Sequence, residues 1–226
     1  MEKLVQGNAA FVLDVLCGRL AFERTGVKLY DTVIHKIERQ GEERYHAVLG
    51  PMRHIRDEEQ EHATFLEETI RSLGGNPDEL TSMKQLETEE SMGIVSVIVD
   101  GHQRVIDLLH ALLAAELADN AGWDVLVKLS SETGDRKAKA AFAKRLAEEA
   151  KHLLFIREAV IRAAEIELLG REQKLPSSFV GAMKKPIAIG GLLGAALLGA
   201  GALIASALFV AKPSIATRSR RLLGVC

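Results

Sequence analysis

Four long stretches of the chain carry apolar residues at intervals that alternate between three and four positions. This interval places the apolar side chains on one face of an α-helix, because residues three and four apart are neighbours on a helix surface. The pattern predicts helices over residues 9–38, 42–73, 92–129 and 135–169. Each would be about 45 Å long at about 1.5 Å per residue. We therefore predict an all-α protein.

The connections between these helices indicate how they pack. Residues 39–41 join the first pair and residues 131–134 join the second pair. Short links force the helices that they join to lie antiparallel. The second and third helices are separated by residues 74–91, a polar stretch that can extend to about 60 Å and so cross a bundle. The predicted fold is a four-helix bundle of two antiparallel hairpins joined by one crossover.

The apolar face of each predicted helix is interrupted by ionisable residues. Burying an unpaired carboxylate is strongly unfavourable, so these residues need a partner. A Glu and a His three positions apart on a helix can reach one point. Four carboxylates and two imidazoles would together neutralise and bind two divalent cations, and mixed oxygen and nitrogen ligands suit iron or manganese. The candidate ligands, in helix order, are Glu23; Glu59 and His62; Glu116; Glu149 and His152.

An internal repeat supports this interpretation. Residues 58–65 and 148–155 both read Glu-Glu-x-x-His-x-x-Phe. Aromatic–Asp pairs also recur, because Tyr30 follows Glu23 and Trp123 follows Glu116 at the same interval. We expect two helix hairpins related by a pseudo-two-fold axis, with equivalent ligands around a symmetric metal pair. Tyr30 and Trp123 themselves are interpreted as core packing.

With these motifs, residues 9–169 resemble the ferritin-like di-iron carboxylate superfamily, and its rubrerythrin-type and bacterial ferritin-like members in particular. The resemblance implies that Glu23 and Glu116 are terminal ligands, that Glu59 and Glu149 bridge two iron ions, and that His62 and His152 each bind one. Rubrerythrins carry a further carboxylate three residues after the third-helix Glu, a position held here by Asp119. The implied cofactor is two iron ions, with manganese as the alternative.

The resemblance also implies chemistry with O₂ or H₂O₂. The first hypothesis is a di-iron oxidoreductase, a ferroxidase or peroxide scavenger in iron or oxidative-stress handling. The chain has two cysteines and no CxxC motif, so an electron donor must come from elsewhere. Two alternatives stay open: a di-iron hydroxylase of a lipophilic substrate such as a quinone precursor, and a non-enzymatic iron-binding scaffold. A homo-oligomer is also expected.

The C-terminal part of the chain has a different composition. Six basic and no acidic residues occur from Lys184 onward, which leaves 23 basic and 31 acidic residues before it, a formal net charge of −8. Residues 187–211 carry no charge, and a membrane-spanning helix needs about 20 apolar residues. We predict a bundle domain over residues 1–170, a linker over 171–185, a transmembrane helix over 186–212 and a basic tail over 213–226.

Charge and the N-terminal sequence bear on location. Four basic residues flank each side of the predicted span, so the positive-inside rule does not decide its orientation. The first residues lack the pattern of a signal peptide, and we therefore expect a single-pass membrane protein with its bundle on the cytoplasmic side. The acidic body argues against a nucleic-acid-binding protein, which would present a basic face, and we expect no nucleic-acid partner.

Overall fold

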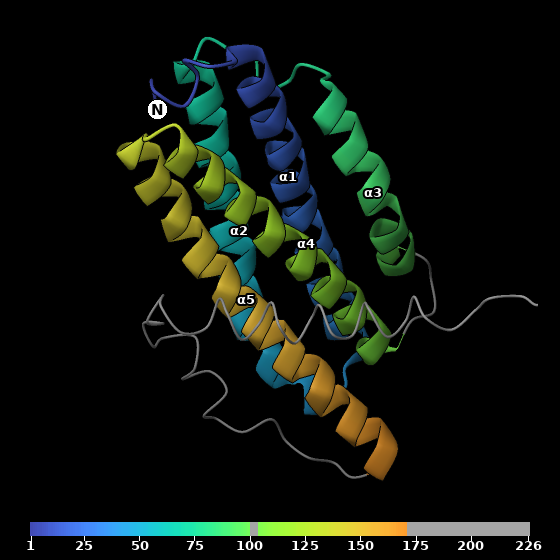
Figure 1. Ribbon diagram of the computed structural model, residues 1–226. Coiled ribbons are helices and arrows are strands. Elements are labelled where there is room, and N and C mark those ends of the chain that lie inside the picture. The colour runs from blue at the N-terminus through green and yellow to red at the C-terminus, as the bar shows by residue number, and fades with distance from the viewer. Residues whose placement is uncertain (100–103, 171–226) are drawn as a thin grey trace, which may run out of the picture. The chain divides into compact units, whose positions relative to one another are not determined.

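The computed structural model describes residues 1–99 and 104–170 of the chain. Within these ranges it contains helices and no strands, as the sequence predicts. The elements are α1 (Ala9–Gln40), the 3-10 turn η1 (Glu43–Tyr45), α2 (His46–Ser72), α3 (Ser82–Val99), α4 (Val105–Glu132) and α5 (Arg136–Leu169). Figure 1 shows these long helices, with α3 alongside α1.

Two hairpins make up the bundle, as the short links predict. Helix α1 packs against α2, and α4 packs against α5. Gly41 follows α1 in a left-handed conformation, and the Gly74–Gly75 pair follows the end of α2. The Asp135 side chain accepts a hydrogen bond from the Ala138 amide and begins α5. An Asp at this position satisfies an amide that the first turn of a helix leaves without a partner.

The predicted third helix is wrong as a single element. Residues 92–99 belong to α3 and residues 105–129 to α4, and α3 begins ten residues earlier than predicted, inside the stretch expected to be a polar connection. Two side chains explain this start. Asp14 of α1 accepts a hydrogen bond from the Met83 amide, with 2.8 Å between nitrogen and oxygen, and the Thr81 hydroxyl accepts one from the Lys84 amide at 3.3 Å.

The core consists of apolar layers on both sides of one polar level. In α1 the buried Leu16 and Leu20 precede Glu23, and the buried Val33 and Ile37 follow it. The other three helices of the bundle have the same order: their charged residues lie between buried apolar ones. The equivalent apolar residues are Met52, Ile55, Leu66 and Ile70 of α2; Leu108, Leu112 and Leu126 of α4; Phe142, Leu146, Ile156 and Ala163 of α5. The polar level is therefore in the middle of the bundle.

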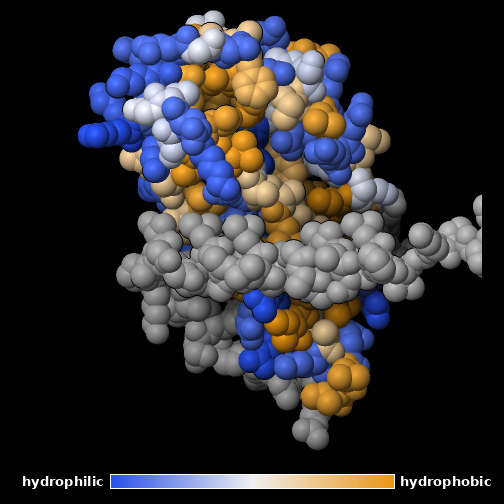
Figure 2. Space-filling view, in the orientation of Figure 1, coloured by the Kyte–Doolittle hydropathy of each residue, from blue (hydrophilic) through white to orange (hydrophobic). Residues whose placement is uncertain are grey.

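Not all apolar residues of the bundle are buried. Figure 2 shows a strip of apolar residues over the part of the molecule where α4 runs. Leu117 and Val125 are the large apolar side chains of α4 that remain exposed, by 43% and 50%. None of the described helices is apolar and long enough to cross a bilayer. The predicted linker, transmembrane helix and basic tail, residues 171–226, lie outside the described part of the chain.

Candidate metal centre

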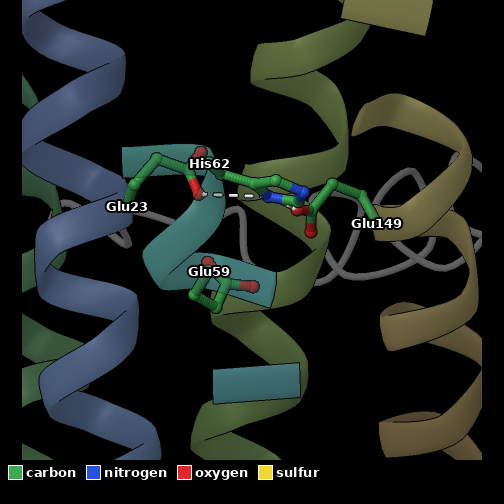
Figure 3. A group of neighbouring side chains, drawn as sticks. All are labelled: Glu23, Glu59, His62 and Glu149. Carbon is green, nitrogen blue, oxygen red and sulfur yellow. Dashed lines mark ion pairs between the residues drawn. The ribbon is translucent and has the colours of Figure 1, made fainter. Parts of the chain in front are cut away.

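The structure brings all six ligand candidates to one level of the bundle. Each is at most 2% exposed. They form two groups. Within each group, every residue offers one nitrogen or oxygen atom, and these atoms all lie within 4.8 Å of one another. Glu59 and Glu149 belong to both groups and therefore lie between them. The first group is Glu23, Glu59, His62 and Glu149, drawn in Figure 3; the second is Glu59, Glu116, Glu149 and His152.

The distances within each group fit ligands of a metal ion. His62 Nδ1 lies 2.8 Å from a Glu149 oxygen and 3.6 Å from a Glu23 oxygen. His152 Nδ1 lies 3.2 Å from a Glu59 oxygen and 3.3 Å from the other Glu149 oxygen. Two ligands about 2.1 Å from one cation and at right angles to each other are about 3 Å apart. The four observed distances, between 2.8 and 3.6 Å, are close to this value.

The atoms that face the centre also lack ordinary hydrogen bonds within the described part of the chain. These atoms include Oε2 of Glu23, both carboxylate oxygens of Glu59 and Glu149, and the Nδ1 atoms of His62 and His152. Their short contacts do not have hydrogen-bond geometry. Buried polar atoms in native proteins almost always have a partner, and an unpaired one is costly. Metal ions held between the two groups would supply that partner, so the residues present fit a pair of divalent cations.

The outer nitrogen of each imidazole contacts a carboxylate from the opposite hairpin. His62 Nε2 on α2 lies 3.1 Å from Glu148 on α5, and His152 Nε2 on α5 lies 2.8 Å from Glu58 on α2. A hydrogen on Nε2, donated to this carboxylate, leaves the lone pair of Nδ1 directed at the centre. The sequence repeat shows both glutamates, but sequence reasoning assigned them no role, because their partners lie on another helix.

The pKa values show how the cluster responds to burial and charge. Burial raises the pKa of the Glu116 carboxyl to about 8. Burial also raises that of Glu149, but the facing imidazoles of His152 and His62 outweigh it and lower the pKa to about 2. For His62, burial lowers the pKa, whereas its contacts with neighbouring glutamates raise it to about 12. Protons thus compensate the buried carboxylates where metal ions would otherwise do so, and metal binding must displace them.

Two large aromatic residues pack directly against the candidate ligands. The Tyr30 hydroxyl donates a hydrogen bond to Glu116, and burial raises the pKa of Tyr30 well above its usual value. The Trp123 ring lies edge-on to the His62 ring, with 5.5 Å between centroids. Both are almost fully buried, as expected for core residues, and both also contact the centre.

A glycine allows one of the shared carboxylates to approach α1. A Cβ atom on Gly26 would lie 2.9 Å from a Glu59 oxygen, closer than such atoms normally come. Any side chain at residue 26 would therefore displace Glu59. Gly26 lies three residues after Glu23, so α1 supplies both a carboxylate and the space for a second one.

Asp119 has a different environment from the other six candidates. It is buried but belongs to neither group. One of its oxygens lies 3.3 Å from the Nη2 atom of Arg19 on α1. The Nε atom of the same guanidinium lies 3.0 Å from a Glu23 oxygen. Sequence reasoning did not identify Arg19, although it lies four residues before Glu23 and so on the same face of α1.

Comparisons with known proteins support this arrangement at the level of the fold. No protein-family model matches the chain, and no curated protein matches it. A ferritin-like di-iron carboxylate protein from Bacillus anthracis str. Ames has 16% identity and a TM-score of 0.53, over 69% of this chain and 99% of its own. The bacterioferritin of Desulfovibrio desulfuricans, described with a di-iron site, has 22% identity and a TM-score of 0.54, over 80% and 91%.

The chain has a ferritin-like fold. The prediction of this bundle type is confirmed, with α3 added between its two hairpins. At these identities the likeness concerns the fold alone. The assignment of ligands in this chain rests on its own buried glutamates and histidines.

Replacing Glu58 and Glu148 together by Gln tests their role in orienting the imidazoles. Both direct ligands and bundle packing remain, but each Nε2 loses a charged acceptor. We expect the affinity for Mn²⁺ to fall by about 10- to 100-fold, as is typical when an outer partner of a ligating His is removed. Isothermal titration calorimetry of the full-length protein measures this change. Glu61→Gln, an exposed change on the same turn of α2, serves as the control, and an unchanged affinity in the double variant would contradict the assignment.

Proposed function

We propose that the protein holds two iron ions between its two hairpins and uses them to oxidise Fe(II) or to reduce O₂ or peroxide. The observation that carries this proposal is the pair of ligand groups that share Glu59 and Glu149. Each group adds one imidazole and one further carboxylate, so the two groups are equivalent. Manganese has the same ligand preference and is the alternative metal.

The chemistry proposed needs two electrons at a time. Two bound Fe(II) ions supply two electrons, which together with two protons reduce one H₂O₂ to two molecules of water, or one O₂ to H₂O₂. The residues of the chain contribute by position and charge. Glu23 with His62 would hold one ion, Glu116 with His152 would hold the other, and Tyr30 keeps a proton on its hydroxyl beside Glu116.

The surroundings of the centre support a small oxidant. Large buried side chains lie directly against the ligands: Tyr30 at Glu116, Trp123 at His62 and Arg19 at Glu23. O₂ and H₂O₂ need little space beside a metal ion, whereas an organic ligand of ordinary size occupies a cleft of about 300–1,000 Å³. We therefore favour the ferroxidase or peroxidase function over hydroxylation of a lipophilic substrate. Electrons for repeated turnover would come from a separate donor.

Rapid mixing of the iron-loaded, full-length protein with H₂O₂ tests this function. We expect ferric absorbance to appear at least about tenfold faster than with free Fe(II), equivalent to about 1.4 kcal/mol of barrier. The expected stoichiometry is two Fe(II) oxidised per H₂O₂. Glu59→Ala with His62→Ala removes the imidazole of the first group and a carboxylate shared by both groups, and should abolish the acceleration.

The matched control is Glu61→Ala with His35→Ala, which removes the same residue types from exposed positions. It should behave as the unaltered protein does. If the unaltered protein binds iron but oxidises it no faster than free Fe(II) reacts, the chain is an iron-binding scaffold and the proposed activity is wrong.

We also propose that residues 186–212 anchor the protein in a membrane, with the bundle on the cytoplasmic side. The proposal is supported by the sequence of residues 187–211, which is uncharged and longer than the roughly 20 residues that a span requires. Lys185 and Lys212 delimit this stretch.

Arginine substitutions within the stretch test the anchor. Leu198→Arg with Leu203→Arg adds two charges to the middle of the span, each of which costs about 2.5–3.5 kcal/mol there. We expect the unaltered full-length protein to float with liposomes and the double variant to remain in the soluble fraction. Leu222→Arg with Leu223→Arg introduces the same charges outside the stretch and should still float. Flotation of all three proteins, or of none, would contradict the proposed anchor.

A further inference from the structure

The centre contains one permanent cation, the guanidinium of Arg19. Its side chain is 3% exposed, and Arg stays protonated in proteins. It is held on several sides: the guanidinium lies 4.3 Å from the centre of the Phe22 ring, and its nitrogens contact Glu23 and Asp119. Burying a charge is unfavourable unless it is paired, so its two carboxylate partners are required.

A glycine on helix α4 leaves the space that this guanidinium occupies. A Cβ atom on Gly122 would lie 1.9 Å from Arg19 Nη1 and 3.0 Å from its Cζ atom. Any side chain at this position of α4 would therefore occupy the space that the guanidinium fills. Asp119 lies three residues earlier on α4, so one turn of this helix supplies both the acidic partner and the space.

The charges of the fully buried side chains at this level of the bundle balance only when Arg19 is counted, apart from the partly exposed Glu58 and Glu148. Five carboxylates are buried there: Glu23, Glu59, Glu116, Asp119 and Glu149. Two divalent cations supply four positive charges and neutral imidazoles supply none. Arg19 supplies the fifth. Without Arg19, one carboxylate would be left without a compensating charge, and in a medium of low dielectric constant such an imbalance is large.

We propose that Arg19 is a positioning residue that sets the charge of the bound metal pair: it holds Asp119 away from the ions and thereby selects two divalent cations over a pair that includes a trivalent one. The ion pair with Arg19 thus keeps Asp119 from binding a metal ion. Asp119 lies three residues after Glu116 on the same helix face but is engaged by the guanidinium. This inference rests on the proposed binding of two metal ions and concerns which charge state the site prefers.

Substitutions at residues 19 and 119 can make the net charge of the protein around the metal ions either more negative or more positive. Arg19→Gln frees Asp119 and adds one net negative charge, so it should favour a trivalent ion. Asp119→Asn removes one negative charge and should disfavour it. The double variant restores the original net charge, and Arg19→Lys preserves it. A merely structural role for the ion pair predicts instead that the double variant is as defective as either single variant, or more so.

The readout is the ratio of the dissociation constants for Mn²⁺ and Tb³⁺. Trp123 is the only Trp of the chain, and its ring contacts His62, so Tb³⁺ luminescence excited through Trp reports on this centre alone. Calorimetry gives the Mn²⁺ value. Comparing variants for the same two ions removes the effect of ion size from the comparison.

We expect Arg19→Gln to shift this ratio towards Tb³⁺ on the order of 10- to 100-fold, as expected for one unit charge about 6–12 Å away at an effective dielectric constant of about 20. Asp119→Asn should shift it the opposite way, and the double variant and Arg19→Lys should stay near the original ratio. Equal ratios in all variants, or a double variant shifted further than Arg19→Gln, would overturn the inference. If the unaltered protein binds neither ion, the proposed metal binding itself is wrong.

Discussion

Several carboxylates are buried at one level of the helical bundle, and their burial determines what the surrounding side chains must provide. Carboxylates that leave water need opposite charge and hydrogen-bond donors, or they must take up protons. The described part of the chain places one permanent cation, Arg19, among five buried carboxylates. The raised pKa values of Glu59, Glu116 and Asp119 have burial as their largest cause. The fold therefore holds a site that is electrostatically incomplete by itself.

The bundle supplies the rigidity that such a site requires. Four long helices each contribute candidate ligands, and buried apolar layers lie on both sides of them. The cross-hairpin contacts of His62 with Glu148 and of His152 with Glu58 join α2 to α5 at the same level. Each hairpin thus orients an imidazole of the other. Preorganised ligands of this kind lose little entropy on binding, which favours affinity and fixed geometry.

The sequence was sufficient to predict which residues are candidate ligands, but it was insufficient to predict the side chains that surround them. Glu23, Glu59 and Glu116 interrupt apolar faces whose spacing is fixed by the helix, so the sequence alone predicts that they converge. The start of α3 depends on Asp14, which is far away along the chain and next to Met83 only after folding. A polar, glutamate-rich segment without a strong apolar face was therefore mistaken for a connection.

Contacts between helices account for the other omissions. Arg19 has an ordinary local pattern, four residues before Glu23, which is typical of a solvated pair on a helix surface. Its importance comes from Asp119 and Gly122 on α4, whose proximity no spacing along the chain indicates. For the same reason the resemblance that assigned Asp119 to the metals took no account of Arg19. Pairing across helices is set by packing, which periodicity within a helix does not determine.

Anomalous diffraction at the iron absorption edge, from crystals of the full-length protein prepared with Fe(II) under anaerobic conditions, would locate bound iron. We expect two anomalous peaks in the bundle. One should lie about 2 Å from His62 Nδ1 and the other about 2 Å from His152 Nδ1, with the carboxylates of Glu59 and Glu149 shared between them. The absence of peaks at this level, with His62 still in direct contact with Glu149, would contradict this expectation.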